Sequence, residues 1–266
     1  MALLFGCVCN QPKRLHDAIT ANGGLLSKSR KVNRWGIGYA QSGQLLLSRH
    51  PKTSPEFTFE KITEHIQADY VIGAAEDEDG LLGNANTQPF RYHSWLFAQS
   101  PKPTLDADGL GELKNALPGF LQRSTKGRHP SEILFHSFLA ELHESKKLDD
   151  ARMSSKDAFD FYKQTLKNVQ EQLKRAPSIS LEALSGNTIL TNSRIMLAIR
   201  CSQTPMYFTQ FKELQDHKRP ETEFRSLLVW SEATPPSDEG GAKWEEIKPN
   251  EALLISRDLI AEKISF

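Results

Sequence analysis

The sequence predicts an α+β fold in which two antiparallel β-sheets stack face to face and helices cover their outer faces. Three observations lead to this fold class. Short strand patterns fill the first and last thirds of the chain, helical patterns fill its centre, and the strand–helix alternation of parallel α/β proteins is absent. Because no clear linker divides the chain, we expect one domain spanning residues 1–266.

The first third begins with an apolar strand at 2–9, which ends at the turn signal Asn10-Gln11-Pro12. The residues after this turn fit a short helix at 13–20 and a loop at 21–31. The remaining expected elements are a hairpin with strands at 35–39 and 44–48 around Ser42-Gly43, a helix at 59–67, a strand at 70–75 and an acidic loop at 76–84.

The centre is predicted to hold two helices. The first begins at Pro130, because proline suits the first turn of a helix, and its apolar residues between 133 and 142 form one face. The second begins after Ser154 or Ser155, which are good N-caps, and stops before Pro177. Its apolar stripe is most simply core packing, and a partner interface is the alternative if a sheet flank is uncovered. The stripe consists of Phe159, Tyr162, Leu166 and Val169.

The last third is predicted to return to short strands. These strands are expected at 179–184, 188–192, 195–201, 226–230 and 252–255, with a surface loop at 235–241.

Composition excludes several classes of function. Lys plus Arg and Asp plus Glu balance at 33 each, so no global charge favours nucleic acid or an anionic membrane. No apolar run is long enough to span a bilayer, and the opening stretch is too short for a signal peptide. Three cysteines do not make a disulfide framework, so we expect a cytoplasmic protein. Since no Walker loop or dinucleotide fingerprint is present, we expect no cofactor.

Several short segments follow one another in a characteristic order. They are Met1-Ala2-Leu3-Leu4-Phe5-Gly6, Trp35-Gly36-Ile37-Gly38-Tyr39, Asn86-Thr87-Gln88-Pro89-Phe90, Trp95-Leu96-Phe97, Ser131-Glu132, Ser185-Gly186 and the stretch from Trp244 to Glu251. In this order, the chain resembles the smaller single-domain class II glutamine amidotransferases over residues 1–256. The resemblance implies the four-layer αββα sandwich of the N-terminal nucleophile hydrolases.

The resemblance also implies a site, and this chain departs from the family at each functional position. The family's N-terminal cysteine attacks the glutamine amide with its own α-amino group as base, and Ala2 stands in its place. The Asn-Gly pair that stabilises the oxyanion falls on Gln99 and Ser100. The arginine that holds the substrate carboxylate falls near Glu76, and the aspartate that holds the substrate ammonium falls on Pro130.

We therefore expect a pocket that has lost its catalytic groups. A remodelled version of it would be lined by Asn86, Thr87, Gln99, Ser100 and Glu132, and it would take a small amino-acid-like ligand or serve a protein partner. No metal ligand is assigned.

Cysteine does not replace the missing nucleophile in this interpretation. Cys7 and Cys9 share one face of the first strand, opposite to Ala2, and neither carries its own α-amine as base. Buried structural cysteine is the favoured interpretation, over a metal-binding Cys-x-Cys pair. Ser100 and Ser131 lack the Gly-x-Ser-x-Gly elbow of a serine nucleophile.

Two other groups of residues have a plain interpretation and a functional one. His129, His136 and His143 lie on or just before the first central helix and are expected at the surface, with a metal site as the alternative. The acidic run 76–79 is expected to be a solvated loop, with cation binding as the alternative.

Three hypotheses follow. In the favoured one, a degenerate amidotransferase-like protein binds a ligand or partner without hydrolysing glutamine. In the second, an enzyme acts on an amide or amidine through Glu76, Glu78 or Glu132 as acid or base. In the third, the pocket is filled by side chains and the chain is a structural interaction module.

Overall fold

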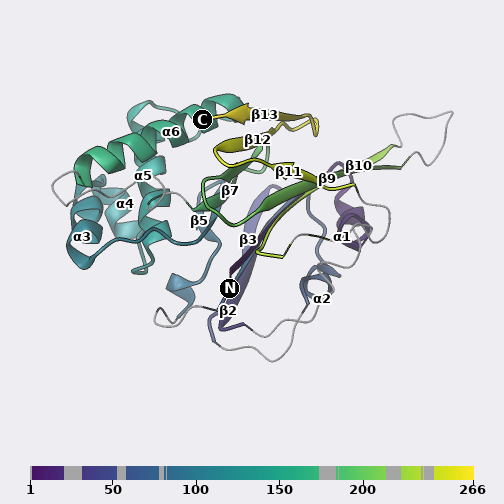
Figure 1. Ribbon diagram of the computed structural model, residues 1–266, viewed down its shortest axis with the longest axis horizontal. Helices are drawn as coiled ribbons and strands as arrows, with labels where there is room; N and C mark the ends of the chain where they lie inside the picture. The colour runs from purple at the N-terminus through teal and green to yellow at the C-terminus, as the bar shows by residue number, and fades with distance from the viewer. Residues whose placement is uncertain are drawn as a thin grey trace.

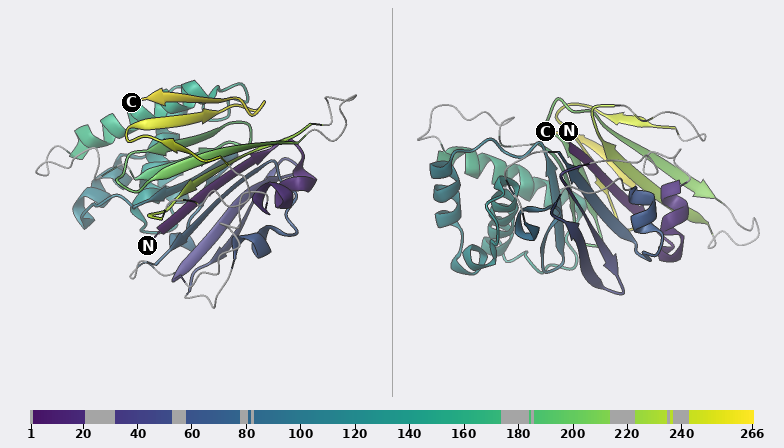
Figure 2. Two further views of the ribbon diagram at one scale, coloured as in Figure 1. Left: turned by 45° about the vertical axis from the view of Figure 1, so that its right-hand side comes forward. Right: turned by 90° about the horizontal axis from the view of Figure 1, so that it is seen from below.

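Two antiparallel sheets stack against each other, with helices on both outer faces (Figure 1). The computed structural model describes residues 2–20, 32–52, 58–77, 81, 83–173, 184, 186–213, 223–234, 236 and 243–266. The two further views show the four layers, with one helical layer beside each sheet (Figure 2). The αββα architecture expected from the sequence is confirmed.

The larger sheet has seven strands in the order β11-β9-β10-β1-β4-β2-β3. Its strands are β1 (Ala2–Cys9), β2 (Arg34–Gln41), β3 (Gln44–His50), β4 (Tyr70–Glu76), β9 (Met206–Glu213), β10 (Phe224–Ser231) and β11 (Glu245–Ile247). The 3₁₀ turn η1 (Pro12–Arg14) leads into α1 (Leu15–Thr20), which lies on the outer face with α2 (Phe59–Thr63). The N-terminal strand β1 therefore lies in the middle of this sheet.

The smaller sheet has six strands in the order β13-β12-β8-β7-β6-β5. These are β5 (Phe90–Tyr92), β6 (Trp95–Ser100), β7 (Asn187–Thr191), β8 (Met196–Arg200), β12 (Glu251–Ile255) and β13 (Ala261–Ser265). Its helical layer consists of α3 (Ala107–Ala116), α4 (Gly119–Ser124), α5 (Pro130–Glu144) and α6 (Ser155–Gln172).

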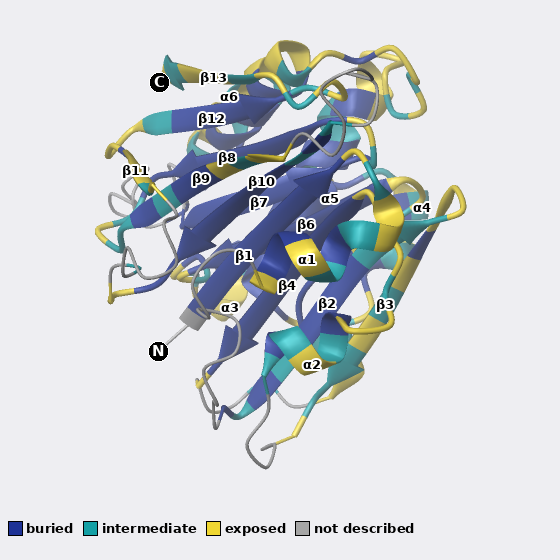
Figure 3. Cartoon of the chain, turned by 90° about the vertical axis from the view of Figure 1, so that its right-hand side faces the viewer, coloured by how far each residue is buried: buried dark blue, intermediate teal, exposed yellow. Residues whose placement is uncertain are grey.

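Successive side chains of β1 point to opposite faces of the sheet and pack into two separate apolar layers. Leu3, Phe5, Cys7 and Cys9 pack under α1 and α2, whereas Leu4 and Val8 pack between the sheets. Figure 3 shows that the central strands are buried along most of their length. The two cysteines therefore share one face, as predicted. Burial raises the pKa of the Cys9 thiol to about 12 and that of Cys7 well above its usual range, so both are inert thiols.

The apolar stripe on α6 is part of the hydrophobic core. Phe159, Tyr162, Leu166 and Val169 are buried against the smaller sheet and α5, which confirms the packing interpretation and excludes the partner-interface alternative. Ser154 begins the helix with a capping box, because its hydroxyl accepts from the Asp157 backbone while the Asp157 carboxylate accepts in return.

Most predicted elements are confirmed. The hairpin turns at Ser42 and Gly43, which have φ values of 52° and 77°, as a two-residue turn with positive φ requires. The helix predicted at 59–67 is shorter and ends at Thr63. The predictions at 21–31, at 179–183 and at 237–241 lie outside the described residues; within the predicted strand at 179–184, only Leu184 is described and it is not in a strand.

The sequence did not predict α3, α4, β5, β6, β9, β11 or β13. Glycine lies in both helices, at Gly109, Gly111 and Gly119, and weakens the helical signal. In the described part of the chain, the helices are all too short or too polar to cross a lipid bilayer.

Candidate functional site

Three neighbouring strand ends bring the site residues into one row. In the register of β1 and β4, Ala2 lies opposite Glu76, and in the register of β2 and β4, Arg34 lies opposite Glu76 on the other side. This row lies at the end of the sandwich where the chain begins (Figure 1). The sheet order, rather than sequence proximity, therefore gathers these residues.

Glu76 is the centre of a buried polar cluster, which we call the Glu76 cluster and define as Arg34, Glu76, Gln88 and His129. Arg34 is 1% exposed and Glu76 is 6% exposed. The Arg34 Nε atom donates to Glu76 Oε2, and Arg34 Nη1 donates to the Leu81 carbonyl at 2.7 Å. The Gln88 amide donates to Glu76 Oε1 at 2.5 Å. The charge of Arg34 is thus neutralised inside the protein.

The electrostatics of the cluster hold Glu76 ionised. Burial alone would raise the Glu76 pKa, but the interaction with His129, the charge of Arg34 and the hydrogen bond from Gln88 outweigh it and lower the pKa to about 2. His129 Nε2 lies 3.5 Å from Glu76 Oε1, so Arg34 and Gln88 make the shorter contacts. A carboxyl with so low a pKa accepts hydrogen bonds near neutral pH but is a poor proton acceptor.

Gln88 connects the cluster to β6. Its Nε2 donates to the Gln99 carbonyl at 2.8 Å, and its Oε1 accepts from the Gln99 backbone N–H at 2.7 Å. Gly36 permits this arrangement, because a Cβ at that position would collide with the Gln88 carbonyl oxygen. The Trp-Gly and Asn-Thr-Gln-Pro-Phe segments of the sequence are therefore coupled: glycine in one lets glutamine in the other reach Glu76.

The two residues predicted to replace the oxyanion pair lie at the end of β6, and both are buried. The Gln99 side chain donates to the Leu184 carbonyl at 3.1 Å, in the apolar layer that faces the helices. Ser100 is followed by Pro101, which has no backbone N–H to donate. The backbone N–H of Gln99 and one N–H of its side-chain amide are thus occupied by protein acceptors, and Pro101 offers no backbone donor.

The start of α5 lies beside the Glu76 cluster. His129 is its N-cap, and its Nδ1 accepts from the Ser131 backbone at 3.2 Å, while Pro130 occupies the first turn. The Glu132 carboxylate accepts from the Lys126 and Gly127 backbones at 3.1 and 2.8 Å. Burial raises the pKa of Glu132, although these hydrogen bonds oppose the shift.

The other two predicted ligand-binding residues make bonds within their own loop and to the α4–α5 connection. The Asn86 side-chain oxygen accepts from the Arg128 backbone at 2.7 Å, and the Thr87 hydroxyl donates to the Gly83 carbonyl at 3.1 Å. Asn86 ends the 3₁₀ turn η2 (Asn84–Asn86), which leads into Gln88. These two hydrogen bonds therefore position the loop.

Two expectations about charged residues are wrong. His129 and His136 are buried rather than at the surface, and of the three histidines only His143 is exposed. The His136 ring nitrogens lie 3.1 and 3.2 Å from the Ser124 and Thr125 hydroxyls, and burial lowers the His136 pKa to about 4. The acidic run does not begin as a solvated loop either, because Glu76 is the last residue of β4 and is buried.

Sequence reasoning missed Arg34. The resemblance places the family's arginine near Glu76, whereas Arg34 comes from the neighbouring strand β2 and is 42 positions away from Glu76 along the chain. The signal that could have found it is the register of a β2–β4 pair. Among the described residues, no group of three or more His, Cys, Asp or Glu side chains is arranged to hold a metal ion.

Comparison with solved structures identifies the fold. A glutamine aminotransferase class-II domain protein from Silicibacter pomeroyi superposes with a TM-score of 0.63 at 15% identity, over 99% of both chains. A predicted glutamine amidotransferase from Pseudomonas aeruginosa gives 0.56 at 14% identity, over 99% of both. The chain has the fold of the class II glutamine amidotransferase domain.

The fold also occurs as part of larger proteins. The glutamine phosphoribosylpyrophosphate amidotransferase of Bacillus subtilis gives a TM-score of 0.59 at 15% identity, where the match covers 99% of this chain and 49% of that enzyme. No protein-family model matches the sequence, and no curated protein matches it. The likeness to the amidotransferase domain is thus one of backbone architecture, with few residues in common.

Proposed function

We propose that this class II glutamine amidotransferase-like domain is a pseudoenzyme that does not hydrolyse glutamine and acts as a ligand- or partner-binding scaffold. One observation carries the proposal: Ala2 begins the central strand, at the position that the resemblance assigns to the nucleophile. A methyl group has no lone pair with which to attack an amide. Removal of the nucleophile of a catalytic triad costs on the order of a millionfold in turnover.

The charges around Ala2 support the same proposal. A free arginine would attract the carboxylate of an amino acid, but Arg34 is paired with Glu76 in the interior. A substrate carboxylate would therefore meet a neutralised guanidinium and a second carboxylate. Each hydrogen bond to a charged group that is lost weakens binding by about 1.5–3 kcal/mol.

The carboxylate enzyme hypothesis is less well supported. A general base works best when its pKa lies near the working pH, and the Glu76 pKa of about 2 is far below it. Glu132 has a raised pKa, but both of its oxygens accept backbone hydrogen bonds in the α4–α5 connection. Glu78 lies outside the described residues.

The absence of turnover is tested by measuring glutamate and ammonia release from glutamine. We expect no release above the protein-free blank. A matched pair of variants guards against a contaminating enzyme: Ser100→Ala changes the end of β6, and Ser48→Ala makes the same change on the exposed edge strand β3. Steady release that Ser100→Ala abolishes and Ser48→Ala preserves would overturn the proposal.

The scaffold role is tested separately by binding. Thermal-shift titrations with glutamine, glutamate, lysine and arginine probe an amino-acid-like ligand, and affinity capture with quantitative mass spectrometry probes a protein partner. A saturable shift that is lost in Ser100→Ala but kept in Ser48→Ala supports a ligand at this end of the sandwich. If no amino acid binds and no specific partner is recovered, the scaffold role is rejected.

A further inference from the structure

A cavity of about 870 Å³ opens at the opposite end of the sandwich from Ala2. Strand β1 begins at Ala2 and reaches this cavity with Val8 and Cys9. The cavity shares none of its lining residues with the Glu76 cluster. It is therefore a second candidate site, and nothing in the preceding proposal depends on it.

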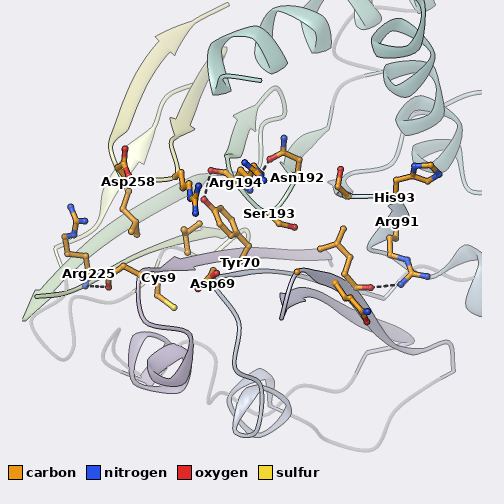
Figure 4. Close-up of a pocket in the computed structure, with 18 residues that line it drawn as sticks. Cys9, Asp69, Tyr70, Arg91, His93, Asn192, Ser193, Arg194, Arg225 and Asp258 are labelled. Atoms are coloured by element: carbon orange, nitrogen blue, oxygen red, sulfur yellow. Dashed lines mark hydrogen bonds between the residues drawn. The ribbon is translucent and has the colours of Figure 1, made fainter. Parts of the chain in front are cut away.

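Turns from both sheets form the cavity walls (Figure 4). The larger sheet contributes the end of β1, the β2–β3 turn and the first residues of β4 and β10, while the smaller sheet contributes the β5–β6, β7–β8 and β12–β13 turns. Figure 4 shows Asp69, Tyr70 and Arg225 on one side of the cavity and Asn192, Ser193 and Arg194 facing them from the other sheet. The cavity is thus a gap between the two sheets where both present polar turn residues.

Positive charge dominates the lining. Four arginines line the cavity, and they are Arg91, Arg194, Arg225 and Arg257. Two carboxylates of the lining, Asp69 and Asp258, oppose them, and the Glu223 carboxylate beside the cavity lies 3.6 Å from the Nε atom of Arg225, so positive charge remains in excess. The chain as a whole has no net charge, so this excess is a local concentration. A wall of this kind attracts an anion.

The arginines keep donors available for a ligand. Arg91 Nη1 donates to the Leu45 carbonyl at 2.6 Å, and Arg194 Nη1 donates to the Ala151 carbonyl at 3.2 Å. A guanidinium has five N–H groups, so each of these bonds leaves four. Burial raises the pKa of the Asp69 carboxyl and the charge of Arg257 opposes this shift, so this guanidinium faces the cavity beside Asp69.

The turn that carries Arg194 is held rigidly. The Tyr70 hydroxyl donates to the Arg194 carbonyl at 2.6 Å, across the gap between the sheets. The Asn192 side-chain oxygen accepts from the backbones of Arg194 and Ile195, both at 3.1 Å. A preformed turn reduces the ordering entropy that a ligand must overcome when it binds.

We propose that this cavity is a binding site for a phosphorylated small molecule. A phosphate monoester carries a charge of about −1.5 to −2 near neutral pH, which is more than that of a single carboxylate, so a cavity lined by four guanidinium groups attracts it more strongly. Guanidinium groups bind phosphate oxygens in pairs of parallel hydrogen bonds. The volume lies in the range of small-molecule sites, so the cavity holds an organic body in addition to the phosphate.

Isothermal titration with inorganic pyrophosphate, inorganic phosphate and citrate at constant ionic strength tests the site. We expect one-to-one saturable binding of pyrophosphate that is tighter than that of citrate. Arg257→Gln weakens it about tenfold or more, because one charge-assisted contact is lost. Arg152→Gln removes the same charge from the exposed connection between α5 and α6, and it leaves the affinity unchanged.

Thermal melts confirm that each variant is folded, and Arg225→Gln replaces Arg257→Gln if the latter does not fold. Absence of saturable pyrophosphate binding overturns the proposal. An equal loss in Arg152→Gln also overturns it, because the attraction would then be general rather than local. Citrate binding that is tighter than pyrophosphate binding refutes the assignment to a phosphorylated ligand. None of these results bears on glutamine hydrolysis, which is measured separately.

Discussion

The Glu76→Gln variant removes one charge from the interior and keeps the size of the side chain. Arg34 is then left as an uncompensated buried cation, because it is 1% exposed and its ion-pair partner is gone. Breaking a buried pair in this way costs about 3–5 kcal/mol. The free energy of unfolding of a typical domain is about 5–15 kcal/mol, so this loss is a large fraction of it.

The pKa of Glu76 gives an independent magnitude. Its value in the folded protein is about 2, against an ordinary value of 4.5. The difference corresponds to about 3 kcal/mol. Because the folded pKa is depressed, this stability is present above pH 4.5 and is lost as the pH falls from 4.5 towards 2. Glu76→Gln has no such group, so its dependence on pH is flatter in that window.

The assay is urea unfolding followed by tryptophan fluorescence, at neutral pH and at steps between pH 4.5 and 2.5. Glu112→Gln is the matched control, since it makes the same change on an exposed position of α3. We expect a loss of about 3–5 kcal/mol for Glu76→Gln and less than about 0.5 kcal/mol for the control. The double variant Arg34→Met/Glu76→Met removes both charges. We expect its loss of stability to be smaller than the sum of the losses in the single variants Arg34→Met and Glu76→Met.

The reasoning is refuted if Glu76→Gln is as stable as the wild type at neutral pH. It is also refuted if the double variant loses the full sum of the two single losses, because the two side chains would then act independently.

Three further predictions concern stability. Gly36→Ala should lose at least about 2 kcal/mol in urea unfolding, because the new Cβ collides with the Gln88 carbonyl; an unchanged midpoint would show that the loop shifts freely. The pKa of His136 is about 4 in the folded protein and ordinarily 6.5, so the wild type loses about 3 kcal/mol of stability as the pH falls from 6.5 to 4. His136→Gln should lose less stability over this pH range, and stability profiles that run parallel to the wild type would contradict this. Ser154→Ala should cost about 1 kcal/mol, because the capping box of α6 is lost, and a thermal melt within error of the wild type would refute that role.

The sequence predicted elements whose signals are local. The Ser42-Gly43 hairpin and the two long helices were recoverable because turn residues, N-caps and apolar stripes specify them within a few positions. Helices α3 and α4 were not, because their glycines weaken the helical pattern and packing against the neighbouring helices has to compensate.

The site was predictable in position but only partly in chemistry. The short segments that follow one another in the family's order placed the start of β1 and the segment around Gln88 at the site. The pairing of Arg34 with Glu76 depends on β4 lying between β1 and β2, which is a property of the sheet order and not of any one segment. The burial of His129 was not predictable from its own segment either, because the carboxylate that faces it, Glu76, lies on a strand more than fifty residues earlier in the chain.

The central claim concerns the end of the sandwich that contains Ala2 and the Glu76 cluster. We infer that this site would not hydrolyse an amide even if the missing thiol were restored. The most direct measurement is ammonia release from glutamine by Ala2→Cys, after mass spectrometry has identified its N-terminal residue and iodoacetamide has shown that the new thiol reacts. We predict no release above the wild-type level, because Arg34 stays neutralised by Glu76 and the Gln99 backbone N–H stays bonded to Gln88. Steady turnover by Ala2→Cys would contradict the account, since it would show that the remaining groups still bind and activate glutamine.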